Sequence, residues 1–236
     1  RPVPWQDGTV IIAVFPGQGS QTPGFLSPWL ELDGATDRLS SFSEAAGVDL
    51  AAARTEWDAD AIRDTQVAQP LIVGASLLSY AAFVEAAGTT PAGVAGHSVG
   101  ELAALAAAGV LSPVDALTLA GVRGRAMADA AAQTPTGMSA ILGGDEAAVL
   151  ARLAELDLTP ANHNGAGQIV AAGALPALAV LAEAPVPATR VIPLQVAGAF
   201  HTSYMAPAVD ALREAAASVA VSDPQTTLWT NADGTV

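Results

Sequence analysis

VAGHSVGEL, residues 94–102, reads as a short apolar strand, a Gly-x-Ser-x-Gly turn and the start of an Ala/Leu-rich helix. A serine in such a turn exposes its hydroxyl, and the flanking glycines let the backbone bend. The helix that follows directs free N–H groups and its positive dipole end toward the point where an oxyanion would develop beside Ser98. The stretch therefore predicts a nucleophile elbow and acyl chemistry through a covalent ester on Ser98.

A serine hydroxyl is a weak nucleophile and needs a base, and the chain offers His97, His163 and His201. His97 adjoins Ser98, and consecutive residues in a tight turn point apart, so we expect it to line the pocket. His163 lies in a predicted hairpin. His201 lies after a predicted strand and before a predicted helix, and it follows the serine as in other nucleophile-elbow enzymes. We therefore expect His201 to be the base.

No carboxylate between Ser98 and His201 stands out as a third catalytic member. The acids in that interval look like charges on helix surfaces: Asp145, Glu146, Glu155 and Asp157. A backbone carbonyl can orient an imidazole as well as a carboxylate can. The sequence therefore predicts a dyad.

The oxyanion hole needs two N–H donors. Val99 N–H follows the nucleophile directly and supplies one. Gln18, in the loop Pro16-Gly17-Gln18-Gly19, is the candidate for the second, since that loop leaves a neighbouring strand. From the spacing alone, an ordinary tight turn is an equally simple interpretation of this loop.

Arg123 lies on a mostly apolar helix within Gly121-Val122-Arg123-Gly124. A glycine inside a helix costs about 1 kcal/mol relative to alanine, so these two glycines indicate a close approach by another element. Arginine is suited to bidentate capture of a carboxylate, and a surface ion pair is the alternative.

Composition narrows the function further. The chain has 236 residues, of which 51% are hydrophobic and 14% charged, enough for one large domain or a domain with an insertion. It has no cysteine, and all its cations are arginines, which excludes thiolate catalysis, disulfides, cysteine-bound metal, Schiff bases and Ser-Lys dyads. A net charge of −14 argues against nucleic-acid binding. No apolar run of about 18 residues and no signal peptide is apparent, so we expect no membrane segment and a cytoplasmic location.

Periodicity predicts an α/β fold. We expect a buried strand at 9–15, a helix at 69–87 starting near Pro70, a strand at 92–96 and helices at 99–108 and 113–131. Residues from about 136 to 195 predict the order β-α-β-β-α-β, a ferredoxin-like unit. The predicted architecture is a hydrolase-like large domain with a parallel sheet, residues 1–132 and 197–236, and an inserted ferredoxin-like small domain, residues 133–196.

These segments together resemble one family, the malonyl-CoA:acyl carrier protein transacylases, whose fold also occurs as a domain in fatty-acid and polyketide synthases. The resemblance covers essentially the whole chain. Six motifs carry it: Phe15-Pro16-Gly17-Gln18-Gly19-Ser20-Gln21, Ala68-Gln69-Pro70, Gly96-His97-Ser98-Val99-Gly100-Glu101, Val122-Arg123-Gly124, Asn162-His163-Asn164, and Gly198-Ala199-Phe200-His201.

The resemblance implies a role for each matching residue. Ser98 would be the nucleophile and His201 the base, with Gln18 and Val99 as oxyanion-hole donors. Arg123 would pair with the malonyl carboxylate. Three further residues would lie at the pocket: Gln69, His97 and Asn162. Members of the family continue past the position of Val236, where the carbonyl that orients the histidine is expected.

The resemblance also implies ping-pong transfer, first from malonyl-CoA to the serine and then to the phosphopantetheine thiol of acyl carrier protein. No bound cofactor or metal is expected, and the protein would act as a monomer or as part of a larger synthase. Phe200 before the histidine, together with Val99, resembles malonyl-selective members, because a phenylalanine there would fill the space of a 2-methyl branch. We expect the carrier, usually acidic, to meet a local arginine rim drawn from Arg152, Arg190 and Arg213.

Two other functions fit parts of the sequence. A serine esterase could use the same elbow, but it would admit water and would have no need of Arg123. A truncated, non-catalytic module that only docks a carrier protein could keep the fold, but it would have no need of an intact Ser98, His201 and Arg123.

Overall fold

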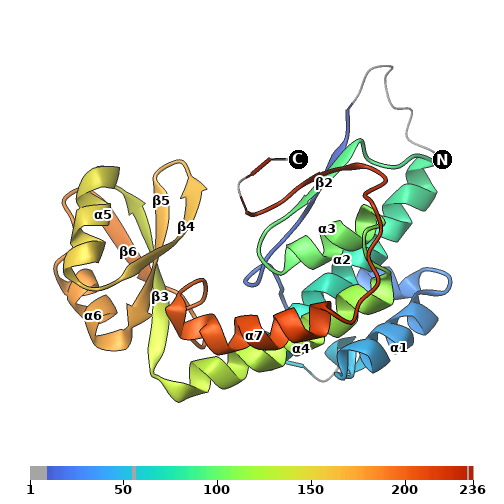
Figure 1. Cartoon of the computed structure of the whole chain (residues 1–236), viewed down its shortest axis with the longest axis horizontal. Helices are drawn as coiled ribbons and strands as arrows, with labels where there is room; N and C mark the ends of the chain where they lie inside the picture. The colour runs from blue at the N-terminus through green and yellow to red at the C-terminus, as the bar shows by residue number, and fades with distance from the viewer. Residues whose placement is uncertain (1–9, 55–56, 233, 236) are drawn as a thin grey trace. The chain divides into compact units, whose positions relative to one another are not determined.

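The structure is a computed structural model that describes residues 10–54, 57–232 and 234–235. The chain divides into two compact units (Figure 1). Unit 1 comprises residues 1–124 and 212–236, and unit 2 comprises residues 125–211. The long helix α4 (Pro113–Gln133) and the helix α7 (Ala206–Ala216) each cross a boundary between the units.

Unit 1 is built on a three-stranded parallel sheet in the order β1-β2-β7. The strands are β1 (Ile12–Phe15), β2 (Gly93–Gly96) and β7 (Thr227–Trp229). Phe15 pairs with Gly96 at the ends of β1 and β2, and Ala95 pairs with Trp229 across β2 and β7. The parallel sheet of the predicted α/β fold is thus present, and both β1 and β2 end at the same edge.

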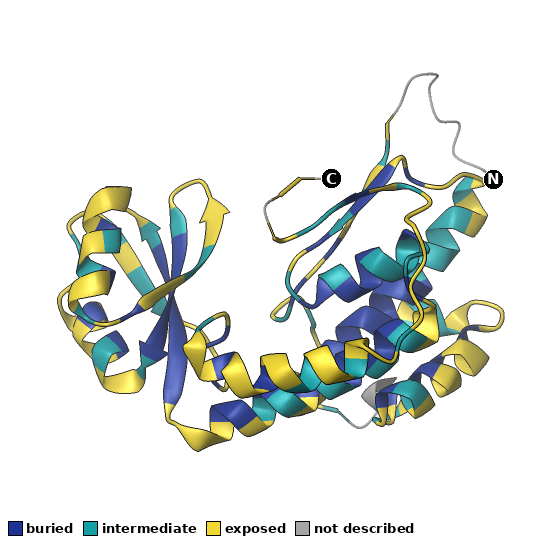
Figure 2. Cartoon of the chain, viewed as in Figure 1, coloured by how far each residue is buried: buried dark blue, intermediate teal, exposed yellow. Residues whose placement is uncertain are grey.

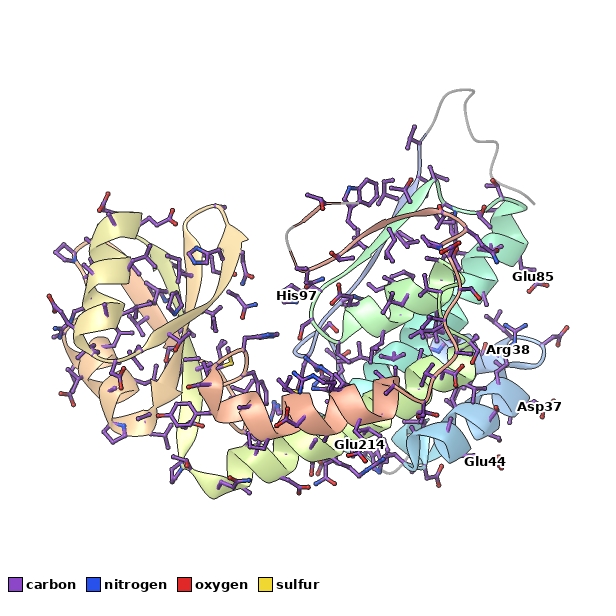
Figure 3. The ribbon with its side chains drawn as sticks, in the orientation of Figure 1. Asp37, Arg38, Glu44, Glu85, His97 and Glu214 are labelled. Atoms are coloured by element: carbon purple, nitrogen blue, oxygen red, sulfur yellow. The ribbon has the colours of Figure 1, made fainter. Side chains whose placement is uncertain are left out.

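Helices of unit 1 pack around one continuous apolar core. Besides α4, they are η1 (Ser27–Glu31), α1 (Ala35–Ala46), η2 (Leu50–Arg54), η3 (Ala61–Arg63), α2 (Thr65–Ala87) and α3 (Gly100–Ala107). The acidic side chains of Asp37 and Glu44 on α1 point away from this core (Figure 3). Leu71, Ile72 and Val73 of α2 are almost completely buried in it.

The helix α2 begins four residues earlier than predicted. Asp64 caps it, since its carboxylate accepts a hydrogen bond from Gln66 N at 2.9 Å, and Pro70 lies inside the helix. The aspartate cap therefore outweighs the proline start signal. By length and hydropathy α2 could cross a membrane, but 61% of its most apolar stretch is buried within the protein, as in the core helix of a globular domain.

The prediction that the first strand is buried is wrong in the described part, and Thr9 lies outside it. Ile12 and Val14 are exposed, Val14 at 70%, while Phe15 is buried (Figure 2). Successive residues of a strand face opposite sides of a sheet, and the core lies on the side of Ala13 and Phe15. A run of β-branched residues does not reveal whether one face or both faces are covered.

Unit 2 contains a four-stranded antiparallel sheet in the order β4-β5-β3-β6. Its elements follow the predicted order: β3 (Thr136–Gly143), α5 (Glu146–Glu155), β4 (Thr159–Gly165), β5 (Gln168–Ala174), α6 (Leu175–Glu183) and β6 (Thr189–Pro193). The helices α5 and α6 cover one face of the sheet (Figure 1) through a core that includes Ile141, Leu153 and Leu181. A short helix, η4 (Ser203–Met205), precedes α7.

The two units divide at 124/125 and 211/212, and the domain boundaries at 132/133 and 196/197 stay predictions. Residues 125–132 and 197–211 group with unit 2. Met127 and Ala131 at the end of α4 share a buried cluster with Met138 of β3 and with Phe200. Helix periodicity gave no sign of this division, because α4 is one uninterrupted helix whose two halves pack against different cores.

Candidate active site

Ser98 lies in the turn that joins β2 to α3 (Figure 1), and its backbone is left-handed, with φ of 54°. Three successive N–H groups close the turn: Gly100 N donates to His97 O, Glu101 N to Ser98 O and Leu102 N to Val99 O. A Cβ on Gly96 would collide with the backbone of Gly100. We call residues 96–100 the Ser98 turn.

Glycine is also required at the far end of this turn. A Cβ on Gly100 would lie 2.6 Å from Pro16 O and closer still to Phe15 O. His97 N donates to Phe15 O at 2.9 Å, so the end of β1 and the turn lie against each other. This contact brings the loop that contains Gln18 next to the Ser98 turn.

Arg123 reaches Ser98 directly. Its Nη2 donates to Ser98 Oγ at 3.2 Å, and its Nη1 donates to Gln69 Oε1 at 2.6 Å. Gln69 is 1% exposed, and its Nε2 donates to Gln18 Oε1 at 3.5 Å. Gln18 Nε2 donates in turn to Thr65 Oγ1 at 3.3 Å. Four of the predicted site residues therefore form one hydrogen-bonded chain within unit 1.

The glycines around Arg123 have the role that the sequence indicates. A Cβ on Gly121 would collide with Ala46 O, and one on Gly124 would lie 2.8 Å from Thr65 O. The helix α4 can therefore lie directly against the end of α1 and the start of α2. This close packing fixes the helix face from which Arg123 extends.

Burial lowers the pKa of Arg123 from its usual 12.5 to about 10, and the negative charge of Glu101 offsets part of that effect. The guanidinium therefore remains protonated at neutral pH although it is poorly solvated. A cation held in this way gains more from an anionic partner than an arginine on an open surface does.

The backbone N–H groups of Gln18 and Val99 donate no hydrogen bond within the described residues. Val99 is the N-cap residue of α3 and is buried. His97 is exposed, and Figure 3 shows its side chain at the turn between β2 and α3. It covers Gly17, where an added Cβ would lie 2.6 Å from His97 Nδ1.

The remaining candidates belong to unit 2. His201 is exposed and left-handed, with φ of 59°. Thr202 Oγ1 donates to Ala199 O at 2.6 Å and accepts from Tyr204 N, while Ala199 N donates to Thr136 Oγ1 at 3.0 Å. We call residues 198–204 the His201 turn.

The other unit 2 candidates and acids also have clear positions. Phe200 is buried in the cluster with Met127 and Met138, and Asn162 is partly buried on β4. Two of the acids discounted in the sequence have surface roles, because Asp145 caps α5 and Glu155 pairs with Arg152 at 2.9 Å. Over the described ranges, no cluster of three or more histidine, aspartate or glutamate residues could hold a metal ion.

Comparison with known proteins identifies the family. Residues 12–234 match the model of the acyl transferase domain. A protein of Mycobacterium bovis named malonyl CoA-acyl carrier protein transacylase is 56% identical over 228 residues, which cover 95% of this chain and 75% of the relative.

The chain belongs to the malonyl CoA-acyl carrier protein transacylase family.

Solved structures of this family agree in fold. The crystal structure of MCAT from Mycobacterium tuberculosis superposes with a TM-score of 0.90 at 54% identity, over 96% of this chain and 76% of that one. A malonyl-transacylase in complex with its type II PKS acyl carrier protein superposes with a TM-score of 0.89 at 30% identity, over 97% and 76% of the two chains. The chain thus spans about three quarters of the length of these transacylases.

Sequence reasoning missed one residue at the Ser98 turn of this transacylase family member. Asn231 accepts a hydrogen bond from Ser98 N at 3.1 Å through Oδ1, and its Nδ2 donates to Gly96 O. Its own backbone N–H donates to Glu101 Oε1 at 2.8 Å. The position of Asn231 at this turn depends on the pairing register of β7 with β2. No local sequence pattern around residue 231 reveals that register.

Proposed function

We propose that this chain transfers a malonyl group from malonyl-CoA to the phosphopantetheine thiol of an acyl carrier protein, through a malonyl ester on Ser98. The observation that carries the proposal is the hydrogen bond between the partly buried, charged guanidinium of Arg123 and Ser98 Oγ. A cation one hydrogen bond from the nucleophile favours an acyl group with its own carboxylate. The names of the similar proteins support the same acyl group and the same acceptor.

The reaction has two balanced halves. In the first half, Ser98 Oγ bonds to the thioester carbonyl carbon, the C–S bond breaks, and the serine proton passes through His201 to the CoA sulfur. In the second half, His201 takes the proton of the carrier thiol, whose sulfur attacks the ester, and the proton returns to Ser98 Oγ. The sum exchanges one thioester for another without a change of oxidation state, so the reaction needs no oxidant or reductant.

The negative charge of each tetrahedral intermediate needs N–H donors. We assign Val99 N–H and Gln18 N–H to this role, because neither donates elsewhere in the described chain and the two loops are joined through His97. Val99 also opens α3, so the positive end of the helix dipole lies at the same place. Preorganised donors of this kind are each worth roughly 3 kcal/mol in acyl transfer.

The other site residues would orient the substrate. Gln69 holds Arg123 in position through the 2.6 Å hydrogen bond. We assign His97 and Asn162 to the acyl pocket because the family resemblance implies this role for them. Phe200 and Val99 would restrict the space beside the acyl group and so disfavour a 2-methyl branch. A restriction of this size is worth about 1–3 kcal/mol.

We further propose that the Ser98 turn is a nucleophile elbow in a hydrolase-like unit, and that unit 2 holds a ferredoxin-like insertion. The left-handed backbone of Ser98 between β2 and α3 supports the elbow. The β-α-β-β-α-β order and the strand order β4-β5-β3-β6 support the insertion. We place the function of the protein in the cytoplasm, because a chain without cysteine needs no disulfide-forming compartment.

We also propose that the acyl carrier protein binds at the arginine rim predicted from the sequence. Arg190 is exposed on β6, and Arg152 on α5 is paired only with a neighbouring glutamate in the contacts described. Substituting Arg190 with glutamate should slow transfer to the carrier and leave the formation of malonyl-serine unchanged. Equal slowing of both steps would remove this residue from the docking surface.

The deciding experiment is the intact mass of the protein after brief incubation with malonyl-CoA. The wild type should gain one malonyl group, and Ser98→Ala should gain none. Arg123→Ala should lose malonyl loading and gain acetyl loading from acetyl-CoA. Arg38→Ala is the matched control, because it removes an exposed arginine on α1. Release of CoA from the wild type without an adduct would support the esterase instead.

A further inference from the structure

Asn231 follows β7 and contacts the Ser98 turn through both ends of its side-chain amide. Oδ1 accepts from Ser98 N–H at 3.1 Å, and Nδ2 donates to the carbonyl oxygen of Gly96. The amide therefore holds the backbone groups on either side of His97. It is 133 residues away from Ser98 in the sequence.

The pairing of β2 with β7 explains this geometry. Ala95 pairs with Trp229, so continuing the parallel register by two residues would pair His97 with Asn231. In a parallel ladder, the partner of His97 donates its N–H to Gly96 O and accepts from Ser98 N–H through its C=O. The side-chain amide of Asn231 makes both of these bonds in place of the backbone. It thus continues the sheet one step beyond the end of β7.

The freed backbone of Asn231 makes a second link. Its N–H donates to Glu101 Oε1 at 2.8 Å, while Thr230 and Gly234 are hydrogen-bonded to each other in the turn that follows. Glu101 lies in the first turn of α3, and its negative charge favours the protonated form of Arg123. One residue therefore holds the strand end, the nucleophile backbone and the carboxylate that supports the guanidinium.

We propose that Asn231 is a positioning residue that holds Ser98 in its left-handed conformation and fixes the direction of Oγ. The inference rests on the proposed function, since it concerns the nucleophile of that reaction. A non-glycine residue at φ of 54° is strained and persists only where its surroundings fix it. Because Asn231 occupies Ser98 N–H, that donor does not face the substrate, and Val99 N–H is the donor from the turn itself.

The test compares three variants by the rate of malonyl-serine formation at saturating malonyl-CoA. Asn231→Ala removes both amide contacts, and Asn231→Asp keeps an acceptor for Ser98 N–H but loses the donor to Gly96 O. Thr227→Ala is the matched control, because it truncates an exposed side chain on β7, four residues before Asn231. A small misplacement of a reacting atom slows reaction by about 100-fold, so we expect roughly that loss in Asn231→Ala and a smaller loss in Asn231→Asp.

The malonyl-CoA concentration for half-maximal rate should stay within about twofold, because the amide touches the nucleophile turn and not the guanidinium. An acylation rate in Asn231→Ala equal to that in Thr227→Ala would overturn the inference. The inference would also be overturned if the loss of acylation rate equals the fraction of unfolded protein, measured by circular dichroism on the same sample. If Asn231→Ala does not fold, Asn231→Asp decides, and a wild-type rate in that variant overturns the inference.

Failure of the proposed function would look different. If the wild type forms no malonyl adduct, the proposed function is wrong. The positioning role of Asn231 can still be measured by labelling Ser98 with a fluorophosphonate probe. Labelling needs an oriented serine and no malonyl group. Asn231→Ala should then react more slowly than Thr227→Ala, and equal labelling rates would overturn the positioning role.

Discussion

The turns at Ser98 and His201, two of those that hold a non-glycine residue in the left-handed region, are held by different means. At the Ser98 turn backbone packs against backbone, since Gly96 and Gly100 leave no room for a Cβ, and the amide of Asn231 adds two side-chain hydrogen bonds. The His201 turn is fixed mainly by side-chain hydroxyls, those of Thr202 and Thr136.

The difference indicates how each turn tolerates change. Backbone atoms of a sheet and a helix cannot shift singly, so a new atom in the Ser98 turn displaces whole elements. A hydroxyl contact can be lost at the cost of one hydrogen bond. We therefore expect substitutions of the glycines in the Ser98 turn to be severe and loss of the hydroxyls at the His201 turn to be milder.

Gly100→Ala should have the largest effect. Its Cβ would lie against Phe15 O and Pro16 O, so we expect a loss of at least about 3 kcal/mol in the free energy of unfolding. Urea denaturation measures it. Gly74→Ala in α2 is the control, because its nearest neighbour is Leu50 Cδ1 at 3.4 Å. An equal change in both variants would show that the turn is not held by its backbone.

Thr136→Val tests the buried anchor of the His201 turn. It would leave the N–H of the fully buried Ala199 without its acceptor, which should cost about 2 kcal/mol of stability. Thr136→Ser keeps the hydroxyl and should recover most of that loss in the same denaturation experiment. A serine variant as unstable as the valine variant would mean that the methyl group, and not the hydrogen bond, matters.

Thr202→Ala should be milder. Thr202 caps η4 by accepting from Tyr204 N and also donates to Ala199 O, and loss of such a cap costs about 1 kcal/mol. We expect acylation by malonyl-CoA to slow by about tenfold if the turn orients His201. Thr202→Ser should restore the rate. Wild-type acylation in Thr202→Ala would show that His201 keeps its conformation without the hydroxyl.

The smallest expected effect is that of pH on the choice between malonyl and acetyl groups. The pKa of Arg123 is lowered only to about 10, so the guanidinium loses its proton only as the pH rises through that value. The ratio of malonyl to acetyl loading should therefore stay constant from about pH 6 to pH 9, even where the overall rate changes. Competition between the two CoA esters, read by mass, measures this ratio. If the ratio already decreases at a pH lower than 9, then Arg123 either loses its proton at a lower pH than expected or does not select the carboxylate.

Local patterns predicted most of the fold. The β2–turn–α3 unit, the close approach at Gly121 and Gly124 and the order of the unit 2 elements all follow from glycine positions and from periodicity. Two predictions, the start of α2 and the burial of β1, were wrong. The start of α2 moved to Thr65 because Asp64 caps it, and β1 is covered on one face only.

The candidate site was predictable to the extent that each residue carries a signal of its own. Ser98, Arg123 and Gln69 do, and the structure joins them in one hydrogen-bonded chain with Gln18. Asn231 carries none, because an asparagine in a turn has an ordinary local explanation. Its role depends on the register between β2 and β7, two short strands more than 130 residues apart.

That long separation also sets an order in time. On the ribosome, β1, β2 and the Ser98 turn emerge early, whereas β7 and Asn231 emerge only after all of unit 2 has been made. The nascent chain then carries a serine whose strand end and backbone N–H still lack their partners. A growing polypeptide of this design acquires its reactive hydroxyl late, when β7 pairs with β2.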